Sequence, residues 1–484
     1  MIKKFYGPPG TGKTEKLIRR AQAYIRVGTP VNKIGYFAFT RKAANEAKNR
    51  MLSKNIHFKK KDLQYFKTLH SLAFQTLNLS EDLVMQEEHY EDLGKEISIR
   101  VNMSSDPNTS PYLTCDNEYF QLILKAREKN ISYEYEYSTG GYSHNLNKDV
   151  LDHVYVNYLK YKTKHNLIDF NDMIQMFIKK AKEQKNFCPR FKVVFIDEAQ
   201  DLSPIQWKMY DIIKAHSDDI YLAGDDDQAI FTWAGADVER FIKEPAIEKV
   251  LNISRRIPKS VQQISQVVIS RIMGLRQIKE YHAKDIDGFV CKINNLNNVN
   301  LLKDKWLILS RTVSRTREIA KELKRQGIYF KIKDMKSFST KLYRCIVNYT
   351  KWTKGEVIEQ TALDDVKEYI DHDQLDKNKT WFECFDKAPL EEKNYIRLML
   401  GNKEKLDEEP RVQLSTIHAA KGGECENVIL VLDNTNKIRK SIERNIRKKD
   451  EEHRVWYVGV TRAKQNLYLL RSKIARKGYQ LYDS

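Results

Sequence analysis

Short apolar runs alternate along the chain with longer segments in which apolar residues recur every three or four positions. Four runs in the first half, IKKFYG, KIGYFAFT, VVFIDE and IYLAGD, each predict a buried parallel β-strand. Between them, TEKLIRRAQAYIR and RKAANEAKNRM have the spacing of amphipathic helices. Strands that alternate with helices indicate a doubly wound α/β domain, in which ligands bind beyond the carboxyl ends of the strands.

A second series of apolar runs follows later, comprising GFVCKI, WLILSR, VQLSTI, NVILVL and NLYLLR. It predicts another α/β unit that begins near residue 251. Residues 81–165 and residues 334–405 interrupt the alternation with polar, helical patterns, so we interpret both as mainly helical insertions. We therefore expect one α/β domain from residues 1–80 and 166–250, and a second from residues 251–333 and 406–484.

Composition narrows the class of protein. A chain of 484 residues is too long for one compact core, and 41% hydrophobic with 31% charged residues is typical of a globular protein. Lysine and arginine number 84 against 65 acidic residues, a formal net charge of +19. This excess fits either a solubilising surface or a polyanionic partner such as nucleic acid.

Cysteine usage and the absence of long apolar runs bear on location. The six cysteines contain no C-x-x-C pair, which argues against a zinc site or a disulfide framework and fits a reducing cytosol. No apolar run approaches transmembrane length, and the start MIKKFYGPPG lacks the long apolar region of a signal peptide. We expect a cytoplasmic protein without a membrane partner.

A complete phosphate-loop pattern, G-x-x-x-x-G-K-[ST], stands in GPPGTGKT. Such glycines let backbone N–H groups wrap phosphate oxygens, and the following helix directs its positive end at them. Lys13 is expected to reach the β- and γ-phosphates, and Thr14 to hold Mg²⁺ through its hydroxyl. The predicted nucleotide-binding residues are Gly7, Pro8, Pro9, Gly10, Thr11, Gly12, Lys13 and Thr14.

The segment VVFIDEAQD supplies carboxylates to go with the phosphate loop. Asp197 ends an apolar strand, where it can complete the Mg²⁺ shell, and Glu198 can orient or deprotonate the attacking water. The alternative is a solvated loop after a buried strand. Together with the phosphate loop, the pair predicts a nucleoside triphosphatase that releases phosphate. Kinases, GTPases, switches and motors remain open at this point.

Eight segments in order carry a family resemblance. They are the two above together with FAFTRKAANEAKNRM, TLHSLAF, NLIDFNDMI, GDDDQAIFTWAGA and the pair VQLSTIHAAKGGECENVILV and EEHRVWYVGVTRAKQNLYLL. With them the chain resembles superfamily-one DNA helicases of the UvrD/Rep/PcrA type, with a reduced regulatory insertion at residues 334–405. The resemblance implies two RecA-like domains that use ATP and Mg²⁺.

The resemblance assigns roles within GDDDQAIFTW. Gln228 is implied to hydrogen-bond the γ-phosphate and the attacking water, while Phe231 and Trp233 flank or stack on bases of a single strand. An aromatic face grips any base and is worth roughly 1–3 kcal/mol per base. The alternative is that both aromatic residues belong to the core.

The family also places arginines at the γ-phosphate, and the matching positions are Arg256 and Arg462, expected from the second α/β unit. Such arginines stabilise transition-state charge. Arg255 replaces a tyrosine that stacks on adenine, so we expect ATP as the main substrate with other nucleotides also used well. Glu424 matches a ribose contact. The matching DNA-backbone contacts are Thr40, His70, Thr416 and His418.

The resulting prediction is an ATP-dependent single-stranded DNA translocase and helicase with 3′ to 5′ polarity, acting at single/double-strand junctions in replication, repair or recombination. We expect it to work as a monomer, with replication or repair proteins as partners, on the nucleoid or in a host cytoplasm. Two alternatives are a translocase that strips proteins from DNA with little unwinding, and a nucleotide-gated clamp that binds nucleic acid without useful turnover.

Overall fold

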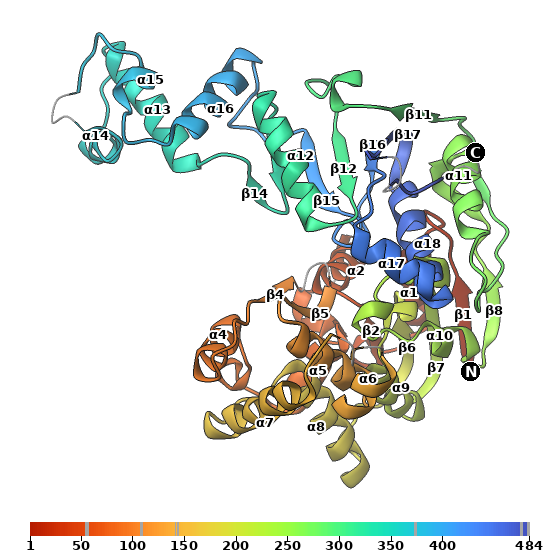
Figure 1. Ribbon diagram of the computed structural model, residues 1–484. Coiled ribbons are helices and arrows are strands. Elements are labelled where there is room, and N and C mark those ends of the chain that lie inside the picture. The colour runs from red at the N-terminus through yellow and green to blue at the C-terminus, as the bar shows by residue number, and fades with distance from the viewer. Residues whose placement is uncertain are drawn as a thin grey trace. The chain divides into compact units, whose positions relative to one another are not determined.

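The structure is a computed structural model that describes residues 1–53, 58–106, 110–140, 142, 145–371, 375–474 and 478–481. The chain divides into two compact units. The first contains Met1–Ile286 and Ile442–Val458, and the second contains Asp287–Ser441 and Gly459–Ser484. Both are α/β units built on a largely parallel sheet (Figure 1), which confirms the predicted fold class.

The first unit contains a six-stranded sheet in which every pairing is parallel. Its strand order is β3-β2-β6-β7-β1-β8. The strands are β3 (Phe66–Lys67), β2 (Ile34–Phe37), β6 (Phe191–Ile196), β7 (Ser217–Gly224), β1 (Ile2–Tyr6) and β8 (Ile247–Val250). The four strands expected from apolar runs are all present. The short β3 and the exposed β8 lack such a run and were not predicted.

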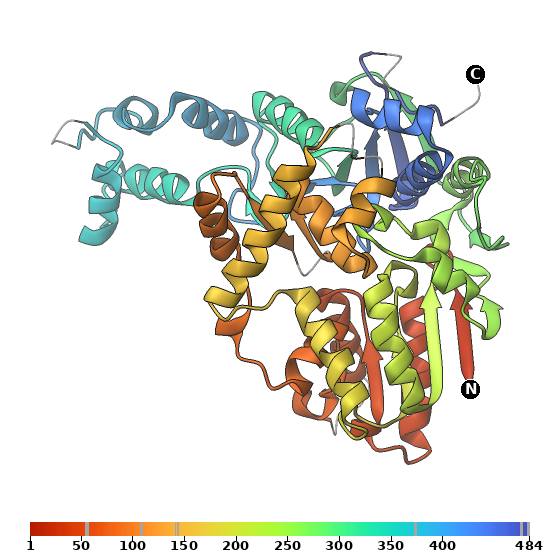
Figure 2. The ribbon, with the colours of Figure 1, turned by 60° about the horizontal axis from the view of Figure 1, so that its bottom comes forward.

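Helices cover both faces of this sheet, as Figure 2 shows. They are α1 (Lys13–Arg26), α2 (Arg41–Ser53), α3 (Leu69–Thr76), α8 (Phe170–Glu183), α9 (Pro204–Ala215) and α10 (Val238–Lys243), with 3₁₀ turns η1 (Val31–Lys33), η2 (Lys60–Leu63), η4 (Ala199–Asp201), η5 (Asp226–Gln228) and η6 (Thr232–Ala234). Val193 and Phe195 join one apolar cluster, whereas Val194 and Ile196 join another. Because alternate residues of a strand point to opposite faces, a strand buried on both faces must be apolar throughout.

The insertion at residues 81–165 is mainly helical. It contains η3 (Glu81–Leu83), α4 (Glu87–Glu96), α5 (Glu118–Lys129), α6 (Tyr133–Thr139) and α7 (Lys148–Lys164). It also contains an antiparallel pair, β4 (Met103–Asp106) and β5 (Ser110–Cys115), that the sequence did not indicate. The helices enclose an apolar core of their own, in which Phe120, Leu151 and Tyr158 are fully buried.

The second unit contains a seven-stranded sheet in the order β11-β17-β16-β12-β15-β13-β14, parallel except for β13 with β14. The strands are β11 (Phe289–Ile293), β17 (Ala463–Leu470), β16 (Cys425–Val431), β12 (Trp306–Ser310), β15 (Val412–Thr416), β13 (Phe330–Ile332) and β14 (Met335–Lys336). All five apolar runs predicted for this unit form strands. The helices are η7 (Leu296–Asn298), α12 (Val313–Arg325), α13 (Thr340–Thr353), α14 (Gln360–Lys367), α15 (Trp381–Cys384) and α16 (Leu390–Gly401).

The compact division differs from the expected domain boundary at residue 250. Residues 251–286 were expected in the second unit but belong to the first. They form β9 (Ile253–Pro258), α11 (Lys259–Ile269) and β10 (His282–Lys284), and much of α18 (Ile446–Val460), which follows α17 (Asn436–Arg444), joins them. Backbone hydrogen bonds to the phosphate loop and buried ion pairs attach these residues to the first unit. Neither kind of contact can be predicted from the pattern of apolar residues.

Across the described part of the chain, no helix has both the length and the apolar character needed to span a membrane.

Candidate nucleotide and DNA site

The phosphate loop joins β1 to α1. Gly7 N donates a 2.9 Å hydrogen bond to Gly224 O, which ties the loop to the end of β7. A Cβ atom on Gly7 would lie 2.1 Å from Lys13 Cγ, so the loop requires glycine there. Gly12 has φ 82° and forms the N-cap of the 14-residue helix α1. The result is a loop of backbone N–H groups at a helix N-terminus, which is a binding site for phosphate.

Lys13 extends back across this loop. Its Nζ donates to Gly7 O at 3.1 Å and lies 3.6 Å from Glu198 Oε1. The ammonium group therefore stands between the loop backbone and the carboxylates that follow β6. This is where a lysine can bind the β- and γ-phosphates of a nucleotide.

The hydroxyl of Thr14 and the carboxylate of Asp197 meet at a hydrogen bond of 2.6 Å, and Tyr36 OH donates to the same Oδ2 at 2.9 Å. Burial and the charge of Glu198 raise the pKa of Asp197 to about 6, against the hydrogen bond from Thr14. A hydroxyl beside a carboxylate is an all-oxygen donor set that fits Mg²⁺. Among the described residues no group of three His, Cys, Asp or Glu could hold a metal alone, so phosphate and water oxygens must complete such a shell.

Glu198 adopts a left-handed backbone conformation with φ 55°, unusual for a residue other than glycine. Gln200 Nε2 donates to Glu198 Oε2 at 2.6 Å and thereby fixes this carboxylate. Gln200 is fully buried. Within VVFIDEAQD nothing marks this glutamine as the partner of Glu198.

Gln228 joins the same network from the other side. Its Nε2 donates to Asp225 Oδ2 at 2.7 Å, and Asp225 N in turn donates to Gln200 Oε1 at 2.9 Å. The hydrogen bonds therefore run Glu198–Gln200–Asp225–Gln228 without a break. They connect the residues after β6 with those after β7, two neighbouring strands of the sheet.

Strand β9 lies against the phosphate loop within the first unit. Arg255 N donates to Gly10 O at 2.9 Å, and Ser254 Oγ donates to Pro9 O at 2.8 Å. A Cβ atom on Gly10 would lie 2.4 Å from Arg256 Cβ. Arg256 therefore comes from the same compact unit as the loop, which corrects the expectation that both arginines belong to the second unit.

Arg462 does lie in the second unit. It donates from Nη1 to Gly423 O at 3.1 Å and from Nη2 to Thr461 Oγ1 at 3.3 Å. Glu424 is nearby in sequence, with its Oε1 3.8 Å from Lys464 Nζ. The structure thus brings Arg462 and the Gly423–Glu424 turn together.

A cavity of about 580 Å³ in the first unit is lined by His70 and by neighbours of Thr40. Its lining includes Phe39, Arg41, Lys67, Thr68, His70, Ser71, Phe74 and Phe170. Burial is the main cause that lowers the pKa of His70 to about 4, and the charge of Arg41 adds to it. The imidazole is therefore neutral at pH 7. Thr40 Oγ1 accepts from Ala43 N at 3.1 Å and so stabilises the start of α2.

The two aromatic residues after Gln228 differ in exposure. Phe231 is 3% exposed, with ring centroids 5.4 Å from Phe39 and 5.9 Å from Tyr112. Trp233 is 38% exposed. The aromatic cluster buries the ring of Phe231, so of the two residues only Trp233 presents an exposed face, and the expected contact of Phe231 with a base stays a prediction. The role of Trp233 stays a prediction.

Thr416 and His418 follow β15 in the second unit. Thr416 ends the strand, and its Oγ1 accepts from Ala419 N at 3.2 Å. His418 is two residues beyond, in the turn that leads towards Gly423. Both DNA-contact assignments stay predictions.

A phosphate loop, a hydroxyl–carboxylate pair and a polar relay at the carboxyl edge of a parallel sheet define a P-loop nucleoside triphosphatase. Comparison with known proteins specifies the family. Residues 5–246 match the UvrD/REP helicase N-terminal domain, and residues 363–473 match the UvrD-like helicase C-terminal domain. The chain belongs to the UvrD/REP helicase family, as the eight segments predicted.

Relatives differ in how much they share with the chain. It is 23% identical over 607 residues to the ATP-dependent DNA helicase PcrA of Bacillus subtilis, covering 96% of this chain and 80% of that protein. It is 27% identical over 246 residues to a probable DNA helicase II homolog of Mycoplasma pneumoniae, covering 48% and 34%. It is 26% identical over 252 residues to the ATP-dependent DNA helicase Rep of Buchnera aphidicola subsp. Baizongia pistaciae, covering 48% and 34%.

Proposed function

We propose that the protein is an ATP-dependent single-stranded DNA translocase and DNA helicase that moves 3′ to 5′. The observation that carries the proposal is the unbroken relay from Glu198 through Gln200 and Asp225 to Gln228, beside the phosphate loop. A protein that only binds nucleotide does not need to align a general base, Glu198, with a side-chain amide, Gln228, that detects the γ-phosphate. The relatives named ATP-dependent DNA helicase support ATP and DNA as substrates, and the polarity is taken from the family.

In this proposal the first unit performs hydrolysis. Lys13 and the loop amides hold the β- and γ-phosphates, and Glu198 accepts a proton from the attacking water as phosphate leaves and ADP remains. Thr14 and Asp197 would hold Mg²⁺, which offsets phosphate charge. Gln228 holds the γ-phosphate and the water through its side-chain amide, a neutral group that can respond to the loss of one phosphate.

The arginines stabilise charge on the phosphates in the transition state. Arg256 does so from the strand that borders Gly10, and Arg462 from the second unit. Arg255 faces the base. A guanidinium stacks on any purine, so we propose ATP as the main substrate with relaxed selectivity for the base. Glu424 holds the ribose.

We propose that Thr40, His70 and Trp233 of the first unit contact single-stranded DNA. The same role is proposed for Thr416 and His418 of the second unit. Hydroxyls and a neutral imidazole suit phosphate oxygens and carry no sequence code. The net charge of +19 supports a polyanionic partner. We propose single strands and single/double-strand junctions as substrates, a monomer as the working form, and action in the cytoplasm.

One experiment separates the three functions under consideration. ATP hydrolysis is measured with and without single-stranded DNA, followed by unwinding of duplexes with a 3′ tail or a 5′ tail. A helicase of the proposed polarity hydrolyses faster with DNA and unwinds only the 3′-tailed duplex. A protein-stripping translocase shows the stimulation but little unwinding, and a clamp shows neither. Equal hydrolysis with and without DNA contradicts the proposal.

A further inference from the structure

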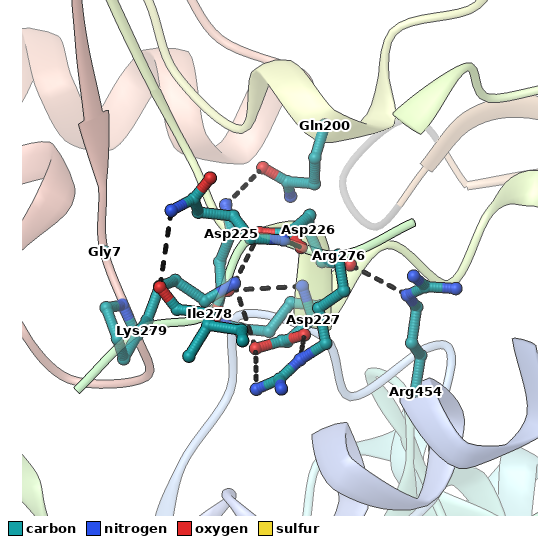
Figure 3. A network of polar contacts seen from close by, with 12 residues as sticks. Gly7, Gln200, Asp225, Asp226, Asp227, Arg276, Ile278, Lys279 and Arg454 are labelled. Atoms are coloured by element: carbon teal, nitrogen blue, oxygen red, sulfur yellow. Dashed lines mark hydrogen bonds and ion pairs between the residues drawn. The ribbon is translucent and has the colours of Figure 1, made fainter. Parts of the chain in front are cut away.

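Three consecutive aspartates beside the proposed sensor gather around one lysine that lies outside every recognised motif (Figure 3). Lys279 Nζ lies 3.0 Å from Asp225 Oδ1 and 2.9 Å from Asp227 Oδ2, and it also donates to Asp226 Oδ1. The lysine side chain is 1% exposed, and none of the three carboxylates exceeds 2%. One buried ammonium group thus contacts three buried carboxylates.

Neighbours of Lys279 secure the second and third aspartates independently. Arg276 donates to both oxygens of Asp227, from Nε at 2.6 Å and from Nη2 at 3.1 Å. Gln277 N donates to Asp226 Oδ2 at 2.9 Å, and Arg454 Nε donates to Asp226 O at 3.0 Å. Buried charges require such pairing, so part of this network serves folding.

Asp225 has a different position, because its carboxylate connects Lys279 to the sensor. Oδ1 faces the lysine, while Oδ2 accepts the 2.7 Å hydrogen bond from Gln228 Nε2. Oδ1 also accepts a 3.2 Å hydrogen bond from Asp227 N, so the lysine and this backbone N–H together fix the rotation of the carboxylate, which in turn orients the Gln228 amide. The backbone of the same residue carries the bond to Gln200 that leads on to Glu198.

We propose that Lys279 is a positioning residue for nucleotide hydrolysis, which acts through Asp225 to hold the amide of Gln228 in its working orientation. The inference rests on the proposed function, in which Gln228 contacts the γ-phosphate and the attacking water. Lys279 itself contacts neither. Its contribution is to remove alternative orientations of the sensor before the reaction begins, because a group that is already oriented does not reorganise in the transition state.

The test is a double-mutant cycle between Lys279→Met and Gln228→Ala, read as ATP hydrolysis with saturating single-stranded DNA. We expect Lys279→Met to lower kcat about tenfold or more while KM changes less than about threefold. In the Gln228→Ala background the same substitution is expected to change kcat less than about twofold, because the group on which it acts is gone. An equal loss of kcat in both backgrounds would overturn the proposal, and so would an effect on KM alone.

Removal of Lys279 leaves three buried carboxylates with one positive charge fewer beside them, which can destabilise the fold. Folding of each variant is therefore measured separately from activity. Each variant is examined by circular dichroism and thermal unfolding. If Lys279→Met does not fold, the cycle is run with Lys279→Met/Asp226→Asn, which removes one charge of each sign.

Lys162→Met serves as a matched control, because Lys162 is also buried and also bridges two carboxylates, those of Asp169 and Asp172. It is expected to lower the unfolding temperature without reducing kcat. Failure of the proposed function gives a different result. In that case wild-type hydrolysis does not respond to DNA, or Gln228→Ala retains full kcat, before any Lys279 variant is considered.

Discussion

The side-chain amide of Gln200 donates a 2.6 Å hydrogen bond to the carboxylate of Glu198. The opposite end of the amide accepts from Asp225 N, so its orientation is determined from both sides. Gly224, directly before Asp225, leaves room for this arrangement, since a Cβ atom there would lie 2.5 Å from Gln200 Oε1. The base proposed for hydrolysis is therefore held by the same residue that positions the sensor loop.

Replacement of Glu198 by glutamine is expected to stop turnover while nucleotide binding is retained. An amide keeps the shape of the side chain but does not accept a proton from water, and loss of a general base reduces rates by about 10²–10⁴-fold. DNA-stimulated ATP hydrolysis measures the loss, and a fluorescent ATP analogue measures binding. The exposed Glu239, paired with Lys243 at 3.1 Å, supplies the control Glu239→Gln. Hydrolysis within about threefold of wild type would show that Glu198 is not the base.

Arg255 offers a test of base selectivity. Its backbone binds Gly10 O at 2.9 Å while its side chain is exposed, so a substitution there leaves the loop bond intact. We expect Arg255→Tyr to raise the kcat/KM ratio of ATP over other triphosphates, because an aromatic ring stacks on a base more selectively than a guanidinium. The ratio is measured by competition among ATP, GTP and CTP. Arg26→Tyr at the last turn of α1 is the control. A strict preference of the wild type for ATP would contradict the proposal that Arg255 relaxes selectivity for the base.

Substitutions of the two aromatic residues after Gln228 are expected to affect different properties, DNA affinity for Trp233 and stability for Phe231. Trp233→Ala removes an exposed face and is expected to weaken single-stranded DNA binding by about 1–3 kcal/mol, or about five- to 150-fold in Kd. Phe231→Ala empties part of a buried aromatic cluster and is expected to lower the free energy of unfolding by about 3–5 kcal/mol. Fluorescence anisotropy with a labelled oligonucleotide and denaturant unfolding measure the two effects. If Phe231→Ala weakened DNA binding and Trp233→Ala lowered stability instead, the aromatic cluster would have to open when DNA binds.

The sequence predicted the nine strands with long apolar runs because burial on both faces of a parallel sheet requires continuous apolar residues. It also located Thr14 and Asp197, whose side chains the structure joins by a 2.6 Å hydrogen bond, because Thr14 stands at the start of the helix after the phosphate loop and Asp197 directly follows a strand. Motif position alone did not distinguish Phe231 from Trp233. The difference depends on Phe39 and Tyr112, which are distant in sequence.

The ion pairs between residues distant in sequence could not be predicted from the sequence. Nothing in RQIKEY marks Lys279 as buried, since a lone lysine in a polar segment predicts an exposed side chain. Its partners are 52–54 residues away, at Asp225–Asp227. The acidic run stands within the motif GDDDQAIFTW, whereas its cation lies outside every motif. This is also why the division at residue 286 could not be located from apolar patterning.

A buried carboxyl group, Glu128, makes stability depend on pH near neutrality. Burial, assisted by the charge of Asp169, raises the pKa of Glu128 from 4.5 to about 7 in the folded protein. Between these two values the folded state binds more protons than the unfolded state, so stability falls as pH rises. The penalty is absent below pH 4.5 and complete above pH 7. Its upper limit is on the order of 3 kcal/mol, at 1.36 kcal/mol for each pH unit.

Glu128→Gln is expected to remove this penalty and so to stabilise the protein at pH 8 but not at pH 5. Denaturant unfolding of wild type and variant across this range gives the difference, in which other titrating groups cancel. Glu96→Gln, which removes a carboxylate from a surface ion pair of 3.0 Å with Lys164, provides the control for loss of one acidic side chain. A Glu128→Gln variant less stable than wild type at pH 8 would mean that the ionised carboxylate is favourably bound in the fold.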